Sequence, residues 1–304
     1  MNSYNADVIS GNPDLNDVYV YEKAKHAVGK SKFSVWLDNL KVFCRIRKER
    51  YDVAIACGSY SPTLAKYAFM TGARLKIGYA NKDAPGLFLN NPVSPLSGTA
   101  HEVMSVFNLL GPLGIHDGPG KLILVPDGQE LRKFQEYRIN TLKDSGKPVI
   151  AIAISARLRA NKWPVEKFMA LIDQILSQNS AYVLLLWAPG SESNLTFPGD
   201  DESAERICSH FGGRIAAYPT HSLKALIAAI AGSDIVVTLD TGSLHMAAAM
   251  GKVTIALMTK GKSLTWYPWK TESIVLTADN NVEDIQVNDV LGAVNKYIGS
   301  CREK

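Results

Sequence analysis

The feature that most constrains the fold of this chain is a repeated alternation between short apolar runs and amphipathic stretches. The amphipathic stretches carry apolar residues at three- and four-residue spacing, the period of a helix with one buried face. Strands are predicted over residues 17–22, 51–58, 75–79, 149–155, 181–188 and 235–239. Helices are predicted over residues 32–50, 61–72, 100–114, 164–179, 202–213, 222–233 and 287–299. Alternation of this kind predicts parallel sheets covered by helices.

The alternation falls into two blocks. A chain of 304 residues is longer than one hydrophobic core usually requires. Charged residues with Gly and Pro over residues 143–148 interrupt the pattern before it restarts. We therefore predict two doubly wound α/β domains that face one another, over residues 1–145 and 146–304. In the first block, the stretch 80–99 is rich in Pro, Gly and Asn and is expected to be a loop.

The composition is typical of a globular protein, with 46% hydrophobic and 20% charged residues. A net charge of +4 is too small to indicate nucleic-acid binding by itself. No apolar run is long enough to span a bilayer, and the first residues lack the pattern of a signal peptide. Four cysteines without Cys-x-x-Cys spacing predict reduced thiols, a cytoplasmic location and no metal site.

A candidate anion site follows the predicted strand 235–239. The segment D-T-G-S-L-H, residues 240–245, leads into a helix of small residues. The first N–H groups of a helix lack intrahelical partners, and the helix dipole adds positive charge there. Gly242 has no Cβ, so a phosphate can approach the backbone closely. Thr241 and Ser243 add hydroxyl groups, and the segment therefore predicts phosphate binding.

Asp240 and His245 indicate a second chemical group beside that phosphate. Like charges repel, so Asp240 is better suited to accept hydrogen bonds from sugar hydroxyls, and His245 can reach the same ligand. A phosphate next to a polyol points to a nucleotide sugar or a sugar phosphate. In the alternative interpretation Asp240 caps the helix, Gly242 forms a turn and His245 belongs to the core. Aspartic proteases also contain D-T-G, but in all-β domains, which the β/α flanks here exclude.

Two further strand ends carry polar groups that would meet at the same edge of the sheet. The loop after strand 149–155 contains Ser155, Arg157, Arg159 and Lys162. Its cations can neutralise a diphosphate leaving group, or the loop is simply solvated. After strand 181–188, the Glu192 carboxylate suits a ribose diol, although an ordinary loop glutamate is the alternative. His221 could line a nucleotide base or be a loop histidine.

Four segments of the second half, together covering residues 148–270, resemble the ADP-heptose:lipopolysaccharide heptosyltransferase family, glycosyltransferase family 9. The segment DTGSLHMAAAMG is similar to the family block D-[ST]-G-x-x-H-x-A-A-A-x-G. NKWPVEKF resembles K-x-W-P-x-x-x-F, and LLWAPGSE and PTHSLKALIAAIAGSDIVV resemble the flanking segments. In the first half, GNPDLNDVYVYE, RYDVAIACG and HEVMSVFNLLGPLGI fit the family more loosely.

The resemblance implies a GT-B fold of two facing Rossmann-like domains with parallel sheets. It implies inverting, metal-independent and cofactor-free transfer of heptose, or a related sugar, from ADP-heptose to a lipopolysaccharide core acceptor. Residues 1–145 would serve the acceptor side, and residues 146–304 would bind the nucleotide-sugar donor. The implied location is the bacterial cytoplasm.

The resemblance also implies roles for particular residues. Thr241, Gly242 and Ser243 would hold the diphosphate, and Asp240 and His245 would contact the sugar side of the donor. Glu192 would bind the ribose. A lysine near Trp163 would meet the phosphates.

The sequence departs from the family pattern at three places. Asn161 stands where the family has that lysine, so Lys162 and Arg157 are alternatives for the phosphate role. The stretch 258–269 differs from the family's F-G-P-T loop. The family's first strand and its G-D-x-x-x-x-T-P loop, which carries the expected general base, are not found. We therefore expect a first domain truncated at its N-terminus and assign no catalytic base.

These departures leave an alternative function open. The chain would then be a catalytically inactive nucleotide-sugar-binding or accessory protein that lacks the general base. A nicotinamide-dependent dehydrogenase is disfavoured, because no G-x-G-x-x-G follows any predicted strand.

The predicted helix 32–50 combines basic and aromatic residues. They are Lys41, Arg45, Arg47, Lys48 and Arg50 with Trp36 and Phe43. A basic face of this kind predicts peripheral contact with anionic lipid, or with an acidic lipid acceptor, on the inner face of the inner membrane. The alternative is an ordinary solvated helix face.

Overall fold

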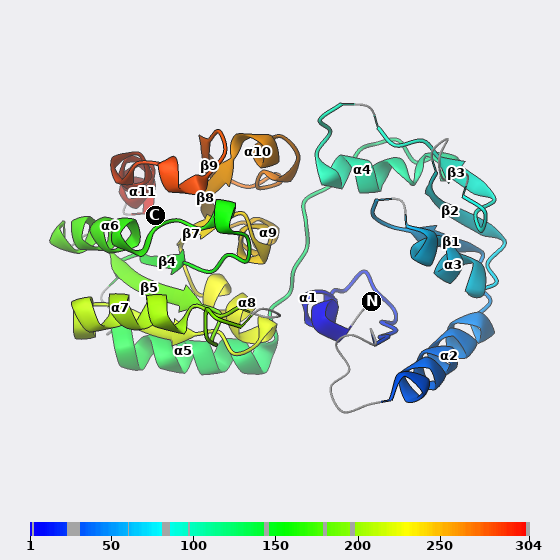
Figure 1. Cartoon of the computed structure of the whole chain (residues 1–304), viewed down its shortest axis with the longest axis horizontal. Helices are drawn as coiled ribbons and strands as arrows, with labels where there is room; N and C mark the ends of the chain where they lie inside the picture. Colours follow the sequence, from blue (N-terminus) through cyan, green and yellow to red (C-terminus); the bar gives the residue numbers. More distant parts are fainter. Residues whose placement is uncertain are drawn as a thin grey trace. The chain divides into compact units, whose positions relative to one another are not determined.

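The computed structural model describes residues 1, 3–22, 31–59, 61–80, 86–96, 98–142, 146–178, 181–194 and 198–301. The chain divides into two compact units. The first comprises Met1–Ile9 and Pro13–Gly120, and the second comprises Ser10–Asn12 and Lys121–Lys304. The strands that pair within each unit are parallel, which confirms the predicted α/β class (Figure 1).

A six-stranded parallel sheet forms the centre of the second unit, with the strand order β6-β5-β4-β7-β8-β9. Its strands are β4 (Val149–Ala153), β5 (Tyr182–Trp187), β6 (Ala216–Pro219), β7 (Ile235–Leu239), β8 (Val253–Thr259) and β9 (Ser273–Ala278). Its helices are α5 (Gly128–Leu142), α6 (Val165–Ser177), α7 (Asp201–Phe211), α8 (Leu223–Ala231), α9 (Gly242–Ala249), α10 (Lys260–Trp266) and α11 (Val287–Cys301). The strand order reverses between β4 and β7, and in such sheets this switch point is where ligands bind.

Both faces of this sheet are buried, as expected for a parallel sheet. On one face Ile150 of β4 and Val237 of β7 belong to a core that includes Phe168 of α6. On the other face Leu244 of α9 packs with Met258 of β8. The continuous apolar runs of the central strands therefore fit the observed burial on both sides, and they hold the strand ends in fixed positions.

The division between the units lies between Gly120 and Lys121, earlier than the predicted break at residues 143–148. Helix α5 explains the difference, because it packs on the second unit, against α8. The Tyr137 hydroxyl donates to the Ala217 carbonyl at 2.9 Å. Asp127 accepts from two N–H groups in the first turn of α5, and these bonds, with Lys224, lower its pKa.

The first unit contains a three-stranded parallel sheet in the order β1-β2-β3. Its elements include β1 (Val53–Ala56), β2 (Leu75–Tyr79), β3 (Asn91–Val93), α1 (Ala6–Ile9), α2 (Lys32–Lys48), α3 (Pro62–Met70) and α4 (Glu102–Asn108). Ile77 and Tyr79 of β2 pack with Leu109 in its core. None of the helices in the described parts of the chain is long and apolar enough to cross a membrane.

Two expectations for the first unit are wrong. Residues 17–22 do not form a strand; Tyr21 forms a single bridge, with backbone hydrogen bonds to Met1 and Ser3, and the Tyr19 carbonyl accepts from the Met1 amino group. The expected loop 80–99 contains the short strand β3, although residues 81–85 and 97 lie outside the described residues. Pro92 sits in the middle of β3, and proline is tolerated there because β3 is the edge strand of its sheet.

Candidate functional site

The strand β7 ends in a sharp turn that opens helix α9. The Thr241 N–H donates to the Leu239 carbonyl at 2.8 Å, and Thr241 is extended at the helix N-cap. The Thr241 side chain makes no capping hydrogen bond. Gly242 is exposed, and a Cβ added there would meet only the flexible end of Met246, at 3.6 Å. The helix start therefore presents its N–H groups without a side-chain cap, as an anion site requires.

Three hydroxyl groups that contact one another hold this turn in place. The Ser243 hydroxyl lies 2.6 Å from that of Thr238 and 2.8 Å from that of Thr241. Both Thr238 and Ser243 are buried. We predicted that the Ser243 hydroxyl itself would hold a ligand, but it is used inside the protein. Ser243 can therefore contribute through its N–H, while its side chain sets the shape of the turn.

Asn161 joins the turn after β7 to the loop after β4. Its amide donates to the Asp240 carboxylate at 3.1 Å and to the Asp240 carbonyl at 3.3 Å. Asn161 is 7% exposed, so the bond to a carboxylate is largely shielded from water. The sequence marked this residue only as a departure from a family pattern. One feature of the sequence could have indicated this contact: both segments follow predicted strands. These strands, β4 and β7, are neighbours in the sheet.

His245 lies in the first turns of α9, close to the position predicted for it. Its ring is 5.5 Å from the Trp266 ring, centre to centre, in an edge-on arrangement. Trp266 closes α10, which follows the neighbouring strand β8. Trp266 was not among the predicted site residues, and α10 forms within the stretch 258–269, which we had compared with a loop of the family.

The loop after β4 carries the predicted cations and Ser155. The Ser155 hydroxyl accepts a hydrogen bond from the Ala188 N–H at 2.8 Å, which ties this loop to the end of β5. Arg157 and Arg159 are exposed. Lys162 instead forms an ion pair with Asp200, with 2.9 Å between its Nζ and the carboxylate. Asp200 is buried, so part of the positive charge of Lys162 is already neutralised.

Glu192 is directed onto the start of α7. Its carboxylate Oε1 accepts from the Ser203 N–H at 3.2 Å and from the Ser203 hydroxyl. The neighbouring Glu202 accepts from the Glu192 N–H and from Ser191, and these hydrogen bonds lower the pKa of Glu202. Among the described residues, no hydrogen bond or ion pair joins Glu192 to the turn at Asp240. Glu192 and Asp200, the partner of Lys162, thus both lie between β5 and α7, in the segment that follows the strand next to β4.

A cavity of about 270 Å³ lies at the opposite edge of the same sheet. It is lined in part by Val149 and Tyr182, the first residues of β4 and β5. Ligands of doubly wound sheets bind at the carboxyl ends of the strands, so this cavity does not compete with the site around Asp240.

Comparison with known proteins agrees with this geometry. The model of glycosyltransferase family 9 (heptosyltransferase) matches residues 39–293. Lipopolysaccharide heptosyltransferase 1 of Escherichia coli O18:K1:H7 is 28% identical over 173 residues, which cover 56% of this chain and 48% of that protein. The chain thus spans about half the length of this curated relative.

Solved structures show the same fold. A glycosyltransferase family 9 protein from Veillonella parvula superposes with a TM-score of 0.79 at 16% identity, over 97% of this chain and 85% of its own. The E. coli ADP-heptose lipopolysaccharide heptosyltransferase II gives a TM-score of 0.70 at 17% identity, over 98% and 88%. The Rossmann-like units are those of the GT-B fold. Because the family model matches most of its length, this chain belongs to glycosyltransferase family 9, the heptosyltransferase family.

Proposed function

We propose that this protein is an inverting glycosyltransferase that moves heptose from ADP-heptose to a lipopolysaccharide core acceptor. Family membership and the names of the similar proteins support this proposal. The observation that carries it is the uncapped start of α9 at the switch point between β4 and β7. A diphosphate with sugars on both sides fits such a helix start, because the Asp240 carboxylate and the Thr241 hydroxyl belong to the turn that leads into it.

In this proposal the N–H groups of Gly242 and Ser243 bind the donor diphosphate, together with the Thr241 hydroxyl. Arg157 supplies the positive charge, because it is exposed at the end of β4. Lys162 is the weaker choice for direct contact, since Asp200 already pairs with it.

The two sugars of the donor lie on either side of the diphosphate in this proposal. Asp240 receives the Asn161 amide on Oδ2, which leaves Oδ1 for hydroxyls of the heptose. His245 faces the same sugar. Glu192 uses Oε1 for both bonds to Ser203, and its Oε2 accepts from the ribose hydroxyls. Ser155 holds the loops after β4 and β5 in register.

The proposed reaction is a single displacement at the anomeric carbon of heptose. The acceptor hydroxyl oxygen bonds to that carbon as its bond to the diphosphate oxygen breaks, and ADP leaves. A base takes the acceptor proton, and the helix N–H groups with Arg157 stabilise the negative charge that develops on ADP. The configuration at the anomeric carbon is therefore inverted.

We expect the variant Asp240→Asn to lower donor affinity or kcat/KM at least about tenfold, or about 1.4 kcal/mol. The change removes the carboxylate charge that strengthens the hydrogen bonds donated by the sugar hydroxyls. Its side-chain oxygen can still accept the Asn161 amide, so the fold should survive. Calorimetry with ADP-heptose, and transfer to a lipid-linked core sugar, would measure the two effects.

Asp289→Asn is the matched control, because Asp289 is an exposed acid of the same unit, on α11. It should leave binding and transfer unchanged. Wild-type affinity and rate in Asp240→Asn would reduce Asp240 to a structural residue. The absence of any ADP-heptose binding by the wild-type protein would overturn the proposal, whereas binding without transfer would favour the accessory protein.

We expect Asn161→Ala to weaken donor binding by about 1 kcal/mol, or about fivefold, because Asp240 loses the amide that orients it. The double variant with Asp240→Asn should lose less than the sum of the two single losses, because Asn161 acts by orienting the Asp240 carboxylate, which the second change has already replaced. Titration of the four proteins with ADP-heptose completes this cycle. Strictly additive losses would show that Asn161 does not act through Asp240.

A further inference from the structure

One side of helix α2 exposes a continuous row of large apolar side chains. Phe33, Trp36, Leu37 and Leu40 are 68%, 57%, 37% and 38% exposed. Their spacing of three, four and seven residues places them on one side of the helix. The rings of Phe33 and Trp36 stack with 6.0 Å between their centres. We name these four residues the α2 stripe.

A second side of α2, next to the α2 stripe, is docked on the first unit. Val35 and Phe43 are buried, and the Phe43 ring lies 4.9 Å from the Tyr67 ring of α3. The Asn39 amide donates to the Glu22 carbonyl at 2.9 Å. Phe43, which the sequence places on the same helix as the basic residues, is thus buried and not part of the exposed surface. The α2 stripe is therefore the outer side of a helix that already has its packing partners within the unit.

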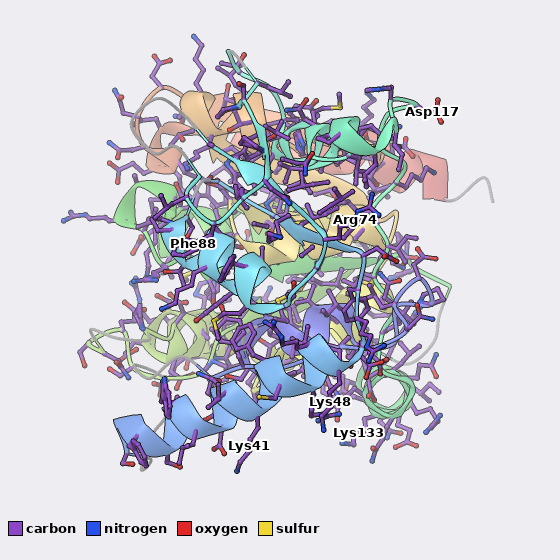
Figure 2. The ribbon with its side chains drawn as sticks, turned by 90° about the vertical axis from the view of Figure 1, so that its right-hand side faces the viewer. Lys41, Lys48, Arg74, Phe88, Asp117 and Lys133 are labelled. Carbon is purple, nitrogen blue, oxygen red and sulfur yellow. The ribbon has the colours of Figure 1, made fainter. Side chains whose placement is uncertain are left out.

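Positive charge adjoins the α2 stripe. Lys41, Arg45 and Lys48 form a second row at helical spacing, and Arg47 adds a further cation in the last turn. Figure 2 shows Lys41 and Lys48 projecting from α2. Asp38 is the only acid in the sequence of this helix, and it pairs with Lys41 at 3.5 Å.

An apolar row beside a row of cations suits the surface of an anionic bilayer. Aromatic and leucine side chains insert at the boundary between headgroups and acyl chains, while long lysine side chains reach the charged headgroups. A second copy of this chain fits less well. In a symmetric dimer the same surface meets itself, so the cation rows would lie close to one another.

We propose that the α2 stripe and its adjoining cations dock this protein on an anionic lipid bilayer. The proposal goes beyond transfer chemistry and concerns the first unit alone, whereas the donor site lies in the second. Vesicle binding needs no donor and no turnover, so it can fail or succeed independently of the proposed function.

The test is co-sedimentation of the full chain with vesicles. We expect binding to vesicles of phosphatidylethanolamine and phosphatidylglycerol, weaker binding to pure phosphatidylcholine, and weakening by high salt, which screens the charges. The double variant Lys41→Gln with Lys48→Gln should bind the anionic vesicles about thirtyfold more weakly, from about 1 kcal/mol per cation. Lys66→Gln with Lys121→Gln removes the same charge at two other exposed positions and should bind like the wild type.

A second pair of variants tests the apolar row. Phe33→Ser with Trp36→Ser should lose at least about tenfold in binding to the anionic vesicles. Ile123→Ser with Ile139→Ser changes two other exposed apolar residues and should lose nothing. Thermal unfolding would check that all variants fold.

Three results would overturn the proposal. The wild-type protein could fail to bind anionic vesicles. The Phe33→Ser and Trp36→Ser variant could bind as the wild type does. Light scattering could show a dimer that this variant dissociates, with no vesicle binding, which would make the α2 stripe an interface between copies.

Discussion

The variant Gly199→Ala should lower the free energy of unfolding by about 3 kcal/mol, at the upper end for an overpacked site. A Cβ at Gly199 would lie 2.2 Å from the carbonyl oxygen of Gly190 and 2.5 Å from its Cα. Backbone atoms cannot rotate aside as a side chain can, so the loop between β5 and α7 must open. This loop carries Glu192 and holds Lys162 through Asp200, so donor binding should weaken as well.

Urea unfolding and calorimetry with ADP-heptose would measure both effects. Gly292→Ala is the matched control, because Gly292 lies within α11 and an added Cβ would meet nothing within 4 Å. It should raise the free energy of unfolding by about 0.5–1 kcal/mol, since alanine favours the helix. Equal stability of the Gly199→Ala and wild-type proteins would refute the close backbone contact.

The variant Phe134→Ala should cost about 3–5 kcal/mol of stability, the usual range for removing a buried ring. The Phe134 side chain is fully buried, and its ring meets that of Tyr218 edge-on at 5.2 Å. Gly232 leaves room for it, because a Cβ there would lie 2.3 Å from the ring. The ring thus fastens α5 to the sheet of the second unit.

Ile139→Ala is the control on the same helix. Ile139 is 62% exposed, so its truncation should change the free energy of unfolding by no more than about 0.5 kcal/mol. Guanidinium unfolding of both variants gives the comparison. Similar small losses in the two would mean that α5 is not part of the core of the second unit, and that the predicted break at residues 143–148 is the better boundary.

The elements predicted best are those whose pattern is enforced by burial on all sides. Strand β7 has the predicted bounds, because a central parallel strand is apolar along its whole length. Helix α5 was not predicted, since Phe134 and Leu142 are its only buried residues and most of its other side chains are polar or charged. Residues 17–22 alternate like a strand, but none of the strands in the described parts of the chain pairs with them.

Within the site, the local backbone was predictable, whereas the side-chain contacts between distant segments were not. Residues 235–245 predict a strand, a turn and a helix start in consecutive positions, and β7 and α9 form there. The contacts of Asn161 with Asp240 and of Lys162 with Asp200 join residues that are 79 and 38 positions apart. Such contacts depend on which strands are neighbours, and the apolar pattern of a strand does not reveal its neighbour.

The position of the candidate site at the switch point allows its loops to be changed one at a time. The turn at residues 240–243, the Asn161 loop and the Glu192 loop each follow a different strand of one sheet. A loop can therefore be exchanged while the strands that hold the other two stay in place. If these loops bind the donor as proposed, new nucleotide or sugar preferences can be engineered by grafting one loop at a time onto an unaltered scaffold.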